Sequence, residues 1–156
     1  MPNHKTTRLS WSNIKNIKLK FDKPLGGSGV NGVDIIVAEL RDNDGVTGLG
    51  FSYVIGGDGS LIAKIAQNLA DIFLLEQPLL DPASHWATIH KSFNRVGDGP
   101  NLLALAALDV ALWDLTAKRN NVSLCQALGG QAGQVPVYAS GGFSPTASPE
   151  IVAETA

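Results

Sequence analysis

A run of mostly apolar residues, 101–119, constrains the fold of this chain more than any other feature. Leucine, alanine and valine occupy most of its helical circumference, so the run predicts a helix buried between two layers. We expect Trp113 to lie in the core with them. Lys118 and Arg119 end the run with positive charges, which suit the C-terminal end of a helix.

Three strand patterns precede this helix. Residues 17–21 alternate apolar and lysine side chains, 34–41 are rich in Ile and Val, and 46–54 form a third segment. The sequence Asp-Asn-Asp-Gly at 42–45 is a strong hairpin signal, because these residues tolerate positive φ. The three segments predict an antiparallel meander, which must pack against something to be stable.

Helical spacing follows in three further places. Residues 61–75 repeat apolar side chains at helical intervals, with Ser60 as the expected N-cap. Asp81 followed by proline predicts the start of a second helix. Ser123 is expected to cap a short helix that ends at Gly129.

The pattern changes near the end of the chain. Residues 135–140 predict a strand, and Ser148 followed by proline predicts the start of a helix. A strand–loop–helix unit is the building block of a parallel α/β sheet or barrel, and one unit cannot close a barrel. We therefore expect a first domain at 1–132 and the start of a truncated barrel at 133–156.

Composition argues against several classes of function. The net charge is −2, so no broad basic surface is expected for nucleic acid. No apolar run approaches the roughly 20 residues that span a bilayer, so we expect no membrane partner. The N-terminus lacks a hydrophobic signal core, so cytoplasmic residence is the default expectation. Cys125 is the sole cysteine, which excludes an internal disulfide.

Three motifs that suggest chemistry are better interpreted as structural. Residues 27–32 match the dinucleotide pattern GxGxxG, but a β-rich run follows where that site needs a helix. His85 and His90 are five residues apart, so they do not share a helical face as zinc ligands would. Asp109 and Asp114 have the same spacing, and we expect both to be structural, with Asp109 accepting hydrogen bonds from a neighbouring loop.

Three segments together resemble a known family. The sequence ALDVALWDLTAKRNNVSLCQALGG at 107–130 is similar to the long helix, and the short helix after it, of the N-terminal capping domain in the mandelate racemase branch of the enolase superfamily. Residues 40–53 resemble that domain's second and third strands, and 136–143 resemble the first strand of the barrel that follows it. The expected fold is α+β: a three-stranded antiparallel meander, a helical bundle, and the first β/α unit of a truncated (β/α) barrel.

The resemblance implies an enzyme that uses Mg²⁺, bound by three carboxylates on the barrel, to stabilise the enediolate formed when a base removes the proton next to a substrate carboxylate. Those ligands and the base would lie beyond Ala156, so we expect the 156-residue chain alone to be inactive. Racemisation, cycloisomerisation and dehydration all remain open, with dehydration of an acid sugar favoured. The family commonly forms homo-oligomers. The alternative is a stand-alone α+β binding or assembly module without catalysis.

The same resemblance implies a role for two glycine-rich segments, 24–32 and 53–60. In the family, the matching loops close over the barrel and exclude water from the substrate. The expected contacts with a small carboxylate substrate are these residues: Leu25, Val30, Tyr53, Ile55 and, at the end of the barrel strand, Ser140.

Overall fold

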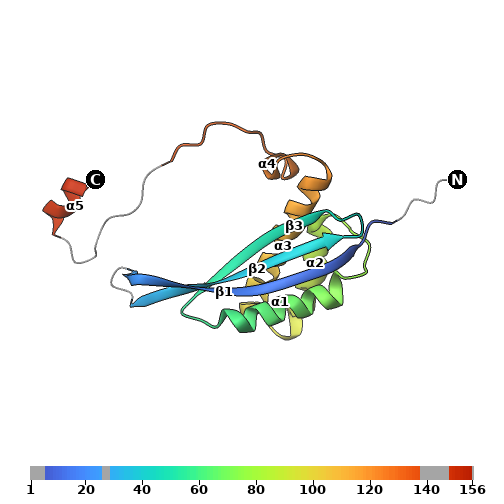
Figure 1. Cartoon of the computed structure of the whole chain (residues 1–156), viewed down its shortest axis with the longest axis horizontal. Helices are drawn as coiled ribbons and strands as arrows, with labels where there is room; N and C mark the ends of the chain where they lie inside the picture. The colour runs from blue at the N-terminus through green and yellow to red at the C-terminus, as the bar shows by residue number, and fades with distance from the viewer. Residues whose placement is uncertain (1–5, 26–28, 138–147, 156) are drawn as a thin grey trace.

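The computed structural model describes residues 6–25, 29–137 and 148–155. It has an α+β fold, in which a three-stranded antiparallel sheet precedes the helices, as the sequence predicts (Figure 1). The elements in chain order are β1 (Leu9–Leu25), β2 (Val30–Asp42), β3 (Thr47–Ile55), α1 (Gly59–Phe73), α2 (Pro82–Lys91), the 3₁₀ helix η2 (Ser92–Arg95), α3 (Gly99–Arg119), α4 (Leu124–Ala127) and α5 (Pro149–Thr155).

The sheet has the order β1-β2-β3, and both pairings are antiparallel. The predicted turn joins β2 to β3, with Gly45 at φ 89°. Asp42 organises this turn, because its Oδ1 accepts hydrogen bonds from the backbone N–H groups of Asp44 and Val46, both at 2.9 Å. Its Oδ2 pairs with the guanidinium of Arg119, which ties the turn to the end of α3.

The two faces of the sheet differ in what covers them. Ile36, Ala38 and Leu40 of β2 are fully buried against the helices. The alternation predicted at 17–21 is present, but its apolar side chains lie on the opposite face. Ile17 and Leu19 are each 45% exposed there. Only one face of the sheet therefore contributes to the core.

Helix α3 is the centre of the core, as its apolar run predicts. Its buried residues are Ala104, Leu105, Ala107, Leu108, Ala111, Leu112, Leu115 and Ala117. Trp113 is not among them: it is half-buried rather than in the core, so the expectation for it is wrong. The expectation that no apolar run is long enough to span a bilayer is wrong for α3, which is long and apolar enough by length and composition, a test that the core helix of a globular fold passes as well.

Two glycines let α3 lie directly against β3. A Cβ atom added to Gly48 would stand 2.7 Å from the Cβ of Leu115, and one added to Gly50 would stand 2.9 Å from the Cα of Ala111. At this close approach the backbone N–H of Leu49 donates to Oδ2 of Asp114 at 2.7 Å, and the Ser52 hydroxyl donates to the Leu103 carbonyl at 2.7 Å. The edge strand is thereby covered by a helix.

The helix starts agree with the predictions except at α1. Asp58, rather than Ser60, caps α1, because its Oδ1 accepts from the Ser60 backbone N–H at 2.9 Å and from its hydroxyl at 2.6 Å. These bonds hold the pKa of Asp58 below its ordinary value, the hydroxyl contributing most. Asp81 caps α2 and Ser123 caps α4, as predicted.

The end of the chain agrees with the prediction only in part. Helix α5 begins at Pro149, with the Ser148 hydroxyl 3.5 Å from the Ile151 backbone N–H. The predicted strand at 135–140 is not formed at 135–137, which are irregular and exposed, and 138–140 lie outside the described residues. Strand geometry requires a partner for its hydrogen bonds, and no described segment pairs with 135–137.

Candidate functional site

The two segments expected to enclose a substrate meet at one end of the sheet. Val33 of β2 pairs with Leu19 on one side and with Ile55 on the other. Strand β3 ends at this level, whereas β1 and β2 remain paired beyond it, as far as the pair Leu25 and Val30. Three residues of strand cover about 10 Å, so the β1–β2 hairpin projects that far past the end of β3 (Figure 1).

The first segment is less of a loop than its glycines suggest. Residues 24–32 were expected to form a loop, but β1 runs to Leu25 and β2 begins at Val30. The hairpin is nevertheless irregular. Between the pairs Lys20–Gly32 and Leu25–Val30, residues 21–24 of β1 stand opposite Asn31 alone. Fewer regular ladder bonds therefore hold this hairpin together than hold the rest of the sheet.

Tyr53 and Ile55 lie in β3 rather than in the loop after it. Tyr53 is 56% exposed and Ile55 is 49% exposed. Both are on the face of the sheet that the helices leave free, since Tyr53 pairs with Ile35 and Ile55 with Val33. Ser140 lies outside the described residues. The structure thus brings four of the five residues expected to contact a substrate to one end of the sheet. Their contact with a substrate stays a prediction.

A polar cluster fixes the second segment at its base. Oδ2 of Asp34 accepts hydrogen bonds from the side-chain amide of Asn16 and from the backbone N–H of Gly59, both at 3.0 Å. Lys18 lies 3.8 Å from the same oxygen. A Cβ atom on Gly59 would stand 2.6 Å from Oδ1 of Asn16, so this position requires glycine. The first turn of α1 is therefore tied to β1 and β2.

Sequence reasoning missed this cluster. Asp34 is an acidic residue beside the apolar run 35–38 of β2, a position where a charge is unusual unless it has partners. This unusual position was the signal in the sequence that could have predicted a polar cluster around Asp34. The partners themselves come from β1 and α1, and their proximity to Asp34 is a property of the fold.

The structure gives the surroundings of the two histidines singled out from the sequence. Among residues 6–25, 29–137 and 148–155, no three His, Cys, Asp or Glu side chains stand close enough to hold a metal ion. His85 is buried and its Nε2 accepts from the Leu80 backbone N–H at 3.0 Å. Burial lowers its pKa, against a smaller opposing effect of Asp81. His90 stacks on Trp86 with ring centres 4.5 Å apart.

The two aspartates of α3 have different surroundings. Asp114 accepts from Leu49 and from the ammonium of Lys118 at 2.6 Å, which confirms a structural role. The hydrogen bonds expected for Asp109 are absent from the part of the chain that the structure describes. Burial raises its pKa, because the carboxylate is partly withdrawn from water without a compensating donor.

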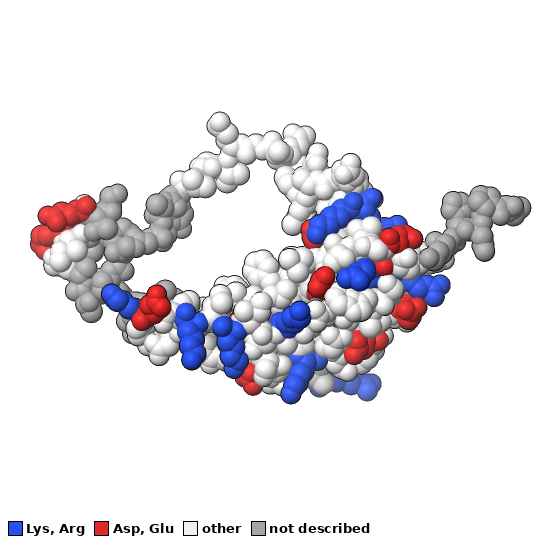
Figure 2. Space-filling view, in the orientation of Figure 1, with Lys and Arg blue, Asp and Glu red and all other residues white. Residues whose placement is uncertain are grey.

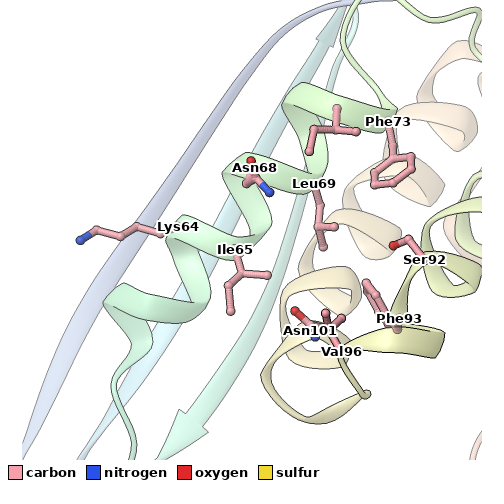
Figure 3. A pocket seen from close by; sticks show the side chains of 10 residues that line it. Lys64, Ile65, Asn68, Leu69, Phe73, Ser92, Phe93, Val96 and Asn101 are labelled. Atoms are coloured by element: carbon pink, nitrogen blue, oxygen red, sulfur yellow. The ribbon is translucent and has the colours of Figure 1, made fainter.

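A pocket lies away from the hairpin, between α1 and the segment joining α2 to α3 (Figure 3). It measures about 520 Å³, and its walls are mostly apolar, with Leu69 and Phe93 among them. Lys64 is its one titratable lining residue, and its side chain extends away from the cavity in Figure 3. Ser92 also lines the pocket, and its hydroxyl donates to the Ile89 carbonyl at 2.7 Å.

Comparison with known proteins identifies the family. A family model described as the N-terminal domain of mandelate racemase / muconate lactonizing enzyme matches residues 25–129. The chain belongs to this family. L-talarate/galactarate dehydratase of Salmonella typhimurium is 34% identical over 154 residues, which cover 93% of this chain and 39% of the relative. An o-succinylbenzoate synthase of Geobacillus stearothermophilus is 36% identical over 72% of the chain and 30% of the relative.

Solved structures agree with this membership of the enolase superfamily. L-talarate dehydratase from Polaromonas sp. JS666, complexed with Mg and L-glucarate, superposes with a TM-score of 0.81 at 30% identity, over 95% of this chain and 42% of that one. The family member therefore spans well under half the length of these relatives. Its fold is that of their N-terminal, capping domain, as the resemblance predicted.

Proposed function

We propose that this chain is the N-terminal part of a Mg²⁺-dependent enzyme that removes the proton next to a substrate carboxylate, with dehydration of an acid sugar as the favoured reaction. The observation that carries the proposal is the 34% identity to L-talarate/galactarate dehydratase over 93% of this chain. The solved relative that binds Mg and L-glucarate supports the same metal and a carboxylate substrate. Other relatives are named as a synthase and a cycloisomerase, so reactions other than dehydration remain alternatives.

In this proposal the described residues enclose the substrate. The β1–β2 hairpin and the turn after β3 lie at one end of the sheet and would cover the mouth of a barrel. Leu25 and Val30 from the hairpin, with Tyr53 and Ile55 from β3, would contact the substrate, and Ser140 would do so from the first barrel strand. Apolar side chains at this position exclude water, which strengthens electrostatic interactions inside the site.

The chemistry itself belongs to groups outside the described residues. Bound Mg²⁺ would supply the positive charge that makes a proton next to an ionised carboxylate removable. The described residues do not offer a ligand set for it. We propose that the ligands and the base come from the barrel that the relatives carry and that this chain matches only at its start. The proposed boundary between the capping domain and that barrel is at 132–133.

The test uses the full reading frame that contains this sequence. The purified product is incubated with Mg²⁺ and a panel of acid sugars in D₂O, and exchange of the α-proton is followed by NMR together with dehydration. Exchange that requires Mg²⁺ is expected with at least one acid sugar, and none with the 156-residue chain alone. Absence of exchange with every carboxylate in the panel would contradict the proposal.

The enclosing role has a separate test in the same full-length enzyme. Ile55→Ala is expected to raise KM about tenfold, because the side chain would contact bound substrate. Ile72→Ala, which truncates a similarly exposed isoleucine on α1, is the control and should leave KM unchanged. Equal KM values for the two variants would remove Ile55 from the proposed contacts.

A further inference from the structure

A smaller cleft lies at the end of α1 that is farther from the proposed substrate contacts. It measures about 310 Å³ and is lined by the last residues of α1, the segment 77–80 and α2. Three of its lining residues are polar: Gln77, His85 and Thr88. Ile72 and Phe73 line both this cleft and the larger apolar pocket, so the two spaces adjoin, and Phe73 marks their shared wall in Figure 3.

His85 offers this cleft a hydrogen-bond donor that no described group uses. The residue is only 4% exposed, and its Nε2 accepts from the Leu80 backbone N–H, so the proton of the neutral ring is on Nδ1. Within the described ranges, Oδ1 of Asn16 is the only fully buried side-chain nitrogen or oxygen without a partner. Nδ1 of His85, which also lacks one there, is therefore open to solvent, and the cleft is the described space that His85 lines.

Two further polar side chains complete the hydrogen-bonding pattern of the cleft. The hydroxyl of Thr88 donates to the Ser84 carbonyl at 2.9 Å, which leaves its oxygen free to accept. The carboxamide of Gln77 can donate and accept, and it bonds to no other residue in the part of the chain that the structure describes. The cleft therefore presents a buried donor, an acceptor and a group of both kinds. A carboxamide, with C=O and N–H on adjacent atoms, complements this pattern.

The charges around the cleft favour a neutral ligand. Its described lining contains no Lys, Arg, Asp or Glu, and burial lowers the pKa of His85, so the ring is neutral at pH 7. Asp81, which caps α2, is the charged group that acts on His85, and its carboxylate would repel an anion. By contrast, Figure 2 shows Lys and Arg gathered along β1, the strand that leads to the hairpin where a carboxylate substrate is proposed to bind. The cleft thus differs in charge from the proposed substrate site.

We propose that this cleft binds a small neutral molecule with a carboxamide head and an apolar body. The carbonyl of the head accepts from Nδ1 of His85, and its N–H donates to the hydroxyl oxygen of Thr88. The body lies against Ile72 and Phe73 and extends into the adjoining apolar pocket of about 520 Å³. Apolar walls with a few convergent polar groups, enclosing roughly 300–1,000 Å³, are typical of small-molecule sites. The proposal does not depend on the proposed enzymatic function.

The test titrates the ¹⁵N-labelled 156-residue chain with benzamide and with benzoate, two probes of the same shape that differ in charge. Benzamide should shift the amide resonances of Leu80 and Phe73 saturably, with a Kd of about 1 mM, an ordinary value for about nine non-hydrogen atoms. Benzoate should bind at least about tenfold more weakly, because it is repelled by Asp81 and has no N–H to donate. A lack of saturable shifts with benzamide up to about 20 mM overturns the proposal, and so does benzoate binding of equal strength.

Variants of the polar lining locate the binding. Gln77→Leu and Thr88→Val change exposed positions, and each should weaken benzamide binding by about fivefold, the effect of one hydrogen bond. Thr47→Val makes the same change as Thr88→Val, but on β3, and should leave the Kd unchanged. His85→Phe should abolish binding, and circular dichroism checks that this variant is folded, since it also leaves the Leu80 N–H without its acceptor. If His85→Phe is unfolded, the two exposed variants decide, and an unchanged Kd in both of them overturns the proposal.

Discussion

Replacing Gly50 by alanine tests whether the close approach of α3 to β3 stabilises this fold. The new Cβ would lie 2.9 Å from the Cα of Ala111 and closer still to backbone atoms of α3. Backbone cannot rotate away as a side chain does, so the helix would have to move by about 1 Å to restore ordinary contact distances. Such a gap forfeits a quarter to a half of the dispersion attraction along the interface.

The same movement would break two hydrogen bonds. The bonds from Leu49 to Asp114 and from Ser52 to Leu103 are both 2.7 Å long, and an extra 1 Å puts them beyond hydrogen-bonding range. At about 1 kcal/mol each, together with about 1–3 kcal/mol for overpacking, these losses mean that Gly50→Ala should lower the free energy of unfolding by about 3–5 kcal/mol.

Urea unfolding followed by circular dichroism measures this loss. Gly133→Ala is the matched control, since a Cβ atom there meets nothing within 4 Å, and it should change stability by less than about 0.5 kcal/mol. A Gly50→Ala protein within about 1 kcal/mol of wild type would refute the argument, because it would show that α3 can shift at little cost.

Three further predictions concern individual titratable groups. Arg119→Met leaves the fully buried Asp42 carboxylate without its cation and should cost about 3 kcal/mol in urea unfolding, part of which Asp42→Asn should restore. Burial lowers the pKa of His85 below its ordinary 6.5, so below that pH the unfolded chain binds a proton that the folded chain does not. The free energy of unfolding should therefore fall as the pH drops below about 6.5. His85→Gln should reduce this dependence of Tm on pH in melting curves. Burial raises the pKa of Asp109, so its ionised carboxylate opposes folding once the pH exceeds 3.8. Asp109→Asn should therefore have a higher Tm than wild type at pH 7, and the two Tm values should be equal at pH 3.

The order of elements was predictable because its signals are local. A turn such as 42–45, a cap such as Asp81 and an apolar run such as 101–119 each act over a few residues. The sequence did not tell which face of the sheet enters the core. Ile17 and Leu19 have the apolar alternation of buried side chains, yet they are exposed, because α1 and α3 cover the other face. Alternation identifies two faces without saying where the helices will lie.

The end of the sheet that carries the candidate site was predictable only in outline. Glycine marked both segments, but the hairpin pairing of Leu25 with Val30 depends on a register that composition does not reveal. Asp34 needed Asn16 and Gly59 beside it, and these lie 18 and 25 residues away in the chain. A local pattern cannot specify partners at such separations.

The aspartates of α3 show how one packing distance decides what a residue does. Asp109 and Asp114 are five residues apart on one helix, and sequence reasoning treated them alike. The side chain of Asp114 reaches the Leu49 backbone only because Gly48 and Gly50, two residues apart on the inward face of β3, allow the helix so close. Glycine inside a strand often marks such an approach of another backbone, so the spacing Gly-x-Gly was the signal for this contact. Asp109 lies on a different side of the helix, without that strand, and burial raises its pKa instead. A folded chain that tolerated a Cβ at position 50 would therefore also free Asp114 from its structural role.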